Sequence, residues 1–167
     1  MNFIEEAIKT KSPNFYSEKV SELFWEDVSQ SFIQYGESLD DIKKTLFYGK
    51  IDFTEGSIPN LNTKVGHLDE DIVHGILGVA TEGVELVQAL AKSMQSGEEI
   101  DLVNIKEEMG DVFWYLAILA NRLGVSFEDV QETVIKKLIH RFPDKFSNEK
   151  ANDRDLDGER QILENGK

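Results

Sequence analysis

Apolar residues recur every three or four positions over most of the chain, which is the period of one face of an α-helix. Residues 18–35 follow this pattern and predict an amphipathic helix that ends near Gly36. Ser38 is predicted to cap a second, short helix that stops at Gly49. Only three prolines interrupt the chain. We therefore expect an all-α protein built as an antiparallel helical bundle.

Three further helices are predicted over residues 69–95, 101–124 and 126–141. Each begins at an Asp or Ser suited to cap a helix, and Gly97 and Gly124 follow the first two. The chain is expected to divide into an N-terminal helical extension of unassigned role (1–66), a helical core (67–146) and a polar tail (147–167). Residues 50–66 read as a loop, and the tail can form a short helix around 155–163.

Composition narrows the class of protein. The 167 residues include no Cys, which excludes disulfides and thiolate zinc sites. The net charge of −14 argues against binding to polymeric nucleic acid. We expect neither a membrane span nor a secretory leader, and hence a cytoplasmic protein.

The acid excess is concentrated in one part of the chain. Residues 69–111 hold eleven acids against two bases, a net charge of −9. Within it, Glu82 and Glu85 lie three residues apart on one predicted helix, and Glu108 and Asp111 repeat that spacing on the next. Because a short connection makes the two helices antiparallel neighbours, the two pairs can meet.

Four facing carboxylates repel one another and need a counter-charge or a metal. Ligands that are all oxygen suit Mg²⁺, with Mn²⁺ as a substitute. Such ions bridge carboxylates to phosphates and activate water, so the pattern predicts a metal-assisted phosphate-ester or anhydride hydrolase. Lys137 and Arg141, four residues apart on the following helix, are candidates to bind phosphate.

Two segments resemble a known family. Thr81-Glu82-Gly83-Val84-Glu85 and Glu107-Glu108-Met109-Gly110-Asp111 resemble the paired acidic motifs of MazG-like nucleotide pyrophosphohydrolases, within the all-α NTP pyrophosphatase superfamily. The segment 137–146, with Arg141-Phe142-Pro143, resembles the Lys-x-x-x-Arg-Tyr-Pro segment that follows in many members. The tail around 152–160 resembles the endings of phage-type members. Thr81 departs from the pattern, since many members carry an acid there.

The resemblance implies a catalytic core at 67–146 that cleaves NTP or dNTP to the monophosphate and pyrophosphate with metal-activated water. It implies that Glu82, Glu85, Glu108 and Asp111 hold Mg²⁺ and that the chain forms a dimer or tetramer. Asn104 and Tyr115, which continue the acidic face, are expected to contact the substrate together with Lys137 and Arg141. The aromatic residues Trp25, Phe47 and Tyr48 can belong either to a base pocket or to the core.

Two alternatives stay open. One is a relative with a narrow substrate, such as dUTP, dCTP or a phosphoribosyl nucleotide. The other is a non-catalytic acidic helical protein that interacts with partners. A carboxylate di-iron bundle is disfavoured, because it needs two Glu-x-x-His pairs and none is present.

Overall fold

The computed structural model describes residues 2–53 and 69–165, and these residues form helices and connecting segments without any strand. The helices are α1 (Phe3–Lys9), the 3₁₀ turn η1 (Ser17–Lys19), α2 (Glu22–Tyr48), α4 (Glu70–Ser96), α5 (Leu102–Leu123), α6 (Phe127–Arg141), α7 (Asn148–Asn152) and α8 (Leu156–Asn165). The predicted all-α class is confirmed. Most of the predicted 50–66 loop lies outside the described residues.

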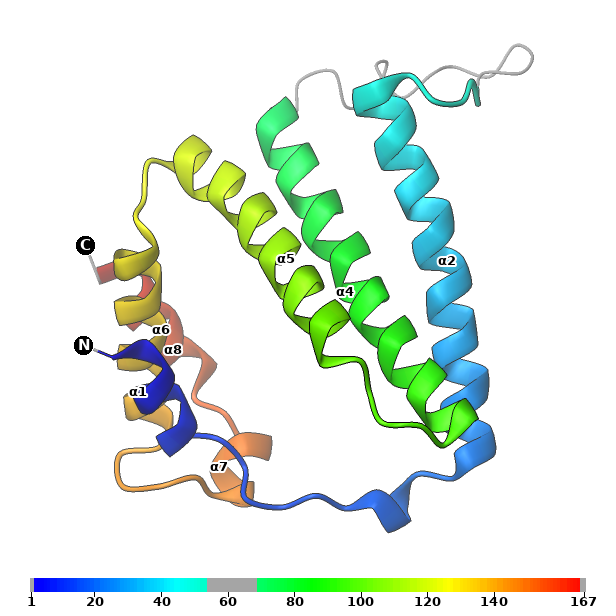
Figure 1. Cartoon of the computed structure of the whole chain (residues 1–167). Helices are drawn as coiled ribbons and strands as arrows, with labels where there is room; N and C mark the ends of the chain where they lie inside the picture. Colours follow the sequence, from blue (N-terminus) through cyan, green and yellow to red (C-terminus); the bar gives the residue numbers. More distant parts are fainter. Residues whose placement is uncertain (1, 54–68, 166–167) are drawn as a thin grey trace. The chain divides into compact units, whose positions relative to one another are not determined.

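The chain forms two compact units. One unit, Val20–Gly124, contains α2, α4 and α5, and α4 packs between the other two helices (Figure 1). The second unit combines Met1–Lys19 with Val125–Lys167, and in it α6 packs against α8 and α1. The predicted division at residues 66 and 146 stays a prediction.

The predicted limits of the three C-terminal long helices are confirmed by their caps. Asp69 accepts hydrogen bonds from the first amides of α4, and Asp101 does the same for α5. Gly97 and Gly124 end these helices in the left-handed conformation, with φ of 71° and 65°. Ser126 and Asp129 form the predicted capping box at the start of α6.

The predicted break near Gly36 is wrong, because α2 continues as one helix from Glu22 to Tyr48. Gly36 serves close packing instead. A Cβ atom placed on it would lie 2.3 Å from the Val84 side chain on α4. The lost helix propensity at Gly36, about 1 kcal/mol, is therefore offset by close approach of α2 to α4.

Glycines on α4 have the same role toward α5. A Cβ atom at Gly78 would lie 2.0 Å from the Tyr115 ring, and one at Gly75 would lie 2.5 Å from Leu119. Gly83, in contrast, has no such neighbour within 4 Å among the described residues. Close packing, rather than room for a ligand, explains Gly75 and Gly78.

The tail helix α8 is anchored by one buried carboxylate. Glu159 is 3% exposed and receives two hydrogen bonds from Arg141 on α6, both of 2.7 Å. Arg154 donates to the same carboxylate, at 2.6 Å from Nη2. These hydrogen bonds from Arg141 and Arg154 lower the pKa of Glu159 to about 2. The predicted short helix in the tail is thus present, and an ion pair joins it to α6.

Candidate metal centre

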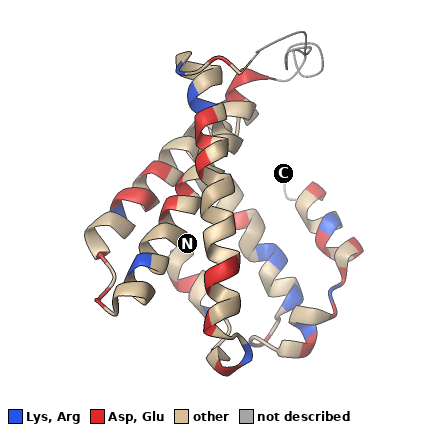
Figure 2. Ribbon diagram, turned by 90° about the vertical axis from the view of Figure 1, so that its right-hand side faces the viewer, with Lys and Arg blue, Asp and Glu red and all other residues tan. Residues whose placement is uncertain are grey.

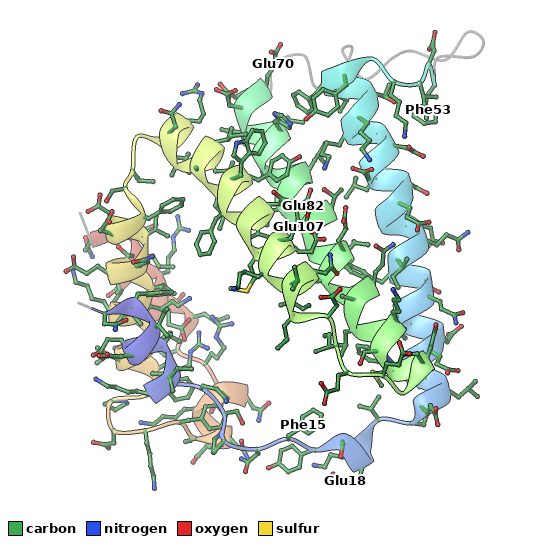
Figure 3. The ribbon with its side chains drawn as sticks, viewed as in Figure 1. Phe15, Glu18, Phe53, Glu70, Glu82 and Glu107 are labelled. Atoms are coloured by element: carbon green, nitrogen blue, oxygen red, sulfur yellow. The ribbon has the colours of Figure 1, made fainter. Side chains whose placement is uncertain are left out.

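Three of the four predicted acids come together between α4 and α5. Glu82 and Glu108 are buried, at 7% and 4% exposure, and Asp111 is exposed. One carboxylate oxygen of each lies within 4.8 Å of the other two. Glu82 lies midway along α4, beside the turn of α5 that carries Glu107 (Figure 3). The antiparallel packing of the two helices therefore brings the two acidic motifs together, as their spacing predicted.

The buried Glu108 is held by a neighbour one helical turn earlier. Asn104 donates from Nδ2 to Glu108 Oε1 at 2.6 Å. Burial raises the pKa of Glu108, and the nearby carboxylates Glu82, Glu107 and Asp111 raise it further, against the opposing effect of the Asn104 hydrogen bond. The predicted site residue Asn104 thus orients an acid of the centre.

Glu85 is exposed and stands outside this group of three. Its pKa is raised, first by removal of the carboxyl group from water and then by the negative charges of Glu108 and Glu82. Glu85 therefore still interacts electrostatically with the acids of the centre. Asp40 on α2 contributes in the same direction. Glu85 therefore borders the acidic centre on the side that faces α2.

A lysine from α2, which no sequence motif predicted, lies beside the carboxylates. Lys43 is 3% exposed, and its Nζ lies 3.2 Å from Glu82 Oε1 and 3.1 Å from Asp40 Oδ1. The same nitrogen donates to Thr81 Oγ1 at 2.7 Å and lies 4.9 Å from the centre of the Tyr115 ring. Lys43 is thus a buried counter-charge to Glu82.

The surroundings of Lys43 keep its ammonium charged. Burial works to lower the pKa of Lys43, but hydrogen bonds with Tyr115, Asp40 and Glu82 outweigh it and raise that pKa above its ordinary value. A signal for this residue exists in the sequence. Ser29, Gly36 and Lys43, the buried residues of α2, are spaced seven apart, which places Lys43 on the same packed face as two small residues.

Tyr115 lies in the wall of the centre rather than at its surface. Its ring is 7% exposed and covers Gly78, and it meets His74 and Trp114 edge-on at centroid distances of 5.5 and 4.8 Å. Phe47 stacks on His74 with centroids 3.9 Å apart. An aromatic group therefore adjoins Lys43 at this end of α2.

The predicted phosphate ligands Lys137 and Arg141 belong to α6, in the other compact unit. Lys137 is half-buried, and the Nε and Nη2 atoms of Arg141 are engaged by Glu159. Their participation in the centre stays a prediction.

The donor set fits a hard divalent cation. All the converging atoms of Glu82, Glu108 and Asp111 are carboxylate oxygens, the ligands that Mg²⁺ and Mn²⁺ take. Two of these acids are buried, and carboxylates removed from water need a compensating positive charge. Figure 2 shows acidic residues distributed along the long helices of this unit.

Fold and site together define an all-α protein whose central helix pair carries a cluster of carboxylates, a donor set that suits a divalent metal. The model of the MazG nucleotide pyrophosphohydrolase domain matches residues 74–146, which include all four predicted acids. An uncharacterized protein of Bacillus subtilis (strain 168), YvdC, is 37% identical over 79 residues, which cover 47% of this chain and 73% of that protein. No solved structure gave a significant match. The chain belongs to the MazG nucleotide pyrophosphohydrolase family.

Among the described residues, no helix is both long and apolar enough to cross a lipid bilayer.

Proposed function

We propose that this protein hydrolyses nucleoside triphosphates between the α and β phosphates, in a reaction that depends on Mg²⁺ and yields a monophosphate and pyrophosphate. The observation that carries the proposal is the convergence of Glu82, Glu108 and Asp111 oxygens within 4.8 Å inside the matched domain. A solubilising acidic surface does not account for it, because two of the three acids are buried.

Glu82, Glu85, Glu108 and Asp111 are the residues that would hold the metal. A divalent ion bound by them supplies Lewis-acid chemistry, since it lowers the pKa of water and offsets phosphate charge. One carboxylate of the group accepts the proton of the attacking water. Asn104 fixes Glu108 for its role through the 2.6 Å hydrogen bond.

Substrate contacts form the second part of the proposal. Lys137 and Arg141 bind phosphate oxygens; Glu159 engages the Nε–Nη2 edge of Arg141, so Nη1 is the nitrogen assigned to a phosphate. Asn104 and Tyr115 contact the nucleoside, with Phe47 and His74 next to Tyr115 as aromatic surface for a base.

The described side chains of Leu102, Val103 and Trp114 on α5 are more than half exposed, which favours assembly of copies into a dimer or tetramer.

The test is a product analysis over a panel of NTPs, dNTPs and phosphoribosyl nucleotides with Mg²⁺ and, separately, Mn²⁺. We expect equal amounts of monophosphate and pyrophosphate, and the panel also distinguishes a broad enzyme from one confined to dUTP or dCTP. Release of orthophosphate alone would contradict the proposed cleavage position.

Two variants and one control connect the activity to the centre. Glu82→Gln and Glu108→Gln should reduce turnover by at least about a hundredfold, since each removes a charged ligand without changing side-chain size. Glu107→Gln removes an exposed charge one position from Glu108 and should leave most turnover intact. Full activity in a protein carrying both Glu82→Gln and Asp111→Asn would refute the assignment.

A further inference from the structure

Lys43 binds one particular oxygen of the metal centre. Its Nζ lies 3.2 Å from Glu82 Oε1, and the Thr81 hydroxyl lies 3.3 Å from the same oxygen. Thr81 is itself fixed, because its hydroxyl donates to the carbonyl of Gly78 at 3.0 Å and accepts from Lys43 at 2.7 Å. Glu82 Oε1 therefore already accepts a hydrogen bond from the Lys43 ammonium.

This occupancy limits how Glu82 can bind metal. In centres with two metal ions, the ions lie about 3.5–4 Å apart and are clamped by shared ligands. A carboxylate that links two ions commonly presents one oxygen to each. A second divalent ion at Oε1 of Glu82 would lie beside the Lys43 ammonium, 3.2 Å from that oxygen, and the repulsion between the two cations disfavours it.

The packing of α2 holds the Lys43 ammonium in one position. Its side chain is 4% exposed and comes from the helix whose Gly36 lies against Val84 of α4. Asp40 Oδ1 lies 3.1 Å from Nζ, and the face of the Tyr115 ring borders it. Asp40 of α2, Thr81 of α4 and Tyr115 of α5 thus confine one positive charge beside Glu82.

We propose that the Lys43 ammonium takes the place of a second divalent ion at Glu82, so that the carboxylate centre binds one divalent ion per chain when no nucleotide is present. The inference rests on the metal centre proposed above. Lys43 is in this sense a positioning residue: it sets the number of ions, and with it the charge that a triphosphate meets on entry.

The experiment counts Mn²⁺ ions bound per chain, by titration with electron paramagnetic resonance of the free ion, in the full-length protein without nucleotide. Wild type should bind one ion. Lys43→Met, which removes the charge and keeps most of the side-chain volume, should bind two. Lys44→Met is the matched control, because Lys44 also pairs with Asp40, but its side chain is 41% exposed and, among the ion pairs of the described residues, none joins it to Glu82. This variant should bind one ion.

Each outcome has a distinct meaning. Two ions in wild type, or one ion in folded Lys43→Met, overturns the inference and leaves the hydrolase proposal standing. No ion in wild type and both variants refutes the metal centre itself. If circular dichroism shows that Lys43→Met is unfolded, Lys43→Gln replaces it, since its amide can still donate to Thr81, and the wild-type count alone still decides between one ion and two.

Discussion

At the scale of single residues, the positions of the side chains in the centre depend on two glycines, which have no Cβ atom and so let the helices approach closely. Tyr115 can border Lys43 only because Gly78 has no Cβ, and Val84 can approach α2 only because Gly36 has none. Helix propensity alone disfavours both glycines. At these two positions, glycine therefore sets the distance between the packed helices, at the expense of helix stability.

Gly78→Ala should therefore destabilise the protein. The added methyl group would lie 2.0 Å from the Tyr115 ring, so the ring must move, and overpacking of this kind costs about 1–3 kcal/mol. Gly83→Ala is the control, because a Cβ there meets no other atom within 4 Å among the described residues; it should stabilise by up to about 1 kcal/mol. Urea unfolding followed by circular dichroism measures both, and equal effects of the two substitutions would contradict the packing argument.

The residues also show where sequence reasoning succeeds. The i, i+3 pairs indicated that the two acidic pairs can meet, because helix periodicity and a short connection limit which faces meet. Glu82, Glu108 and Asp111 do converge, and Glu85 stands outside the group. Lys43 could not be found in this way. Its partner Glu82 lies 39 positions further along the chain, and a lone lysine on an amphipathic helix usually lies in solvent.

At the scale of the elements, local capping chemistry determined most helix limits. Asp69, Asp101 and the Ser126–Asp129 pair satisfy amides within their own first turns, so each start could be predicted from the sequence. Gly36 misled the prediction, because a helix-ending glycine and a glycine at a close helix contact look the same in one sequence. Only the facing Val84, 48 positions later, distinguishes the two cases.

The attachment of α8 to α6 predicts a dependence on pH. Glu159 has a pKa of about 2 in the folded protein, below the ordinary value of 4.5. Its ion pair therefore stabilises the fold fully above pH 4.5, and this contribution is lost as pH falls from 4.5 through about 2. Glu159→Gln leaves Arg141 and Arg154 without their anion and should cost about 3 kcal/mol or more at pH 7.

The difference in unfolding free energy between wild type and Glu159→Gln should shrink steadily as pH falls from about 4.5 toward 2, because in that range the unfolded chain binds a proton that the ion-paired Glu159 of the folded protein does not. Glu164→Gln provides the comparison, since Glu164 pairs with Arg160 within exposed side chains and should change stability by less than about 1 kcal/mol. A Glu159→Gln effect that does not vary with pH would exclude the ion pair as its cause.

At the scale of the whole molecule, the two compact units differ in charge. Residues 20–124 hold nineteen acids against seven bases, a net −12 of the total −14, and this unit contains the carboxylate centre. The remainder carries a net −2. The acid excess noted in the sequence is therefore a property of the unit that would bind metal, where a divalent ion relieves repulsion.

A divalent ion should thus stabilise one unit selectively. At a concentration of Mg²⁺ about a hundredfold above its dissociation constant, bound metal contributes about 2.7 kcal/mol. Hydrogen exchange should slow in α2, α4 and α5 on addition of Mg²⁺ and should change little in α6 and α8. Removal of the metal with a chelator should reverse the protection, and Glu108→Gln should abolish it; equal protection of both units would argue against a site confined to residues 20–124.

The burial of Lys43 has a consequence for whether the MazG domain can fold apart from the rest of the chain. The residues that a family comparison recognises, 74–146, begin after α2 has ended, yet α2 supplies the cation at Glu82 and the small-residue surface that receives Val84. The recognised domain is therefore not an autonomous module. If α4 and α5 were transplanted into another scaffold, that scaffold would have to supply an ammonium group and a closely packed helix in place of α2. Without them, the carboxylates would not adopt the same arrangement.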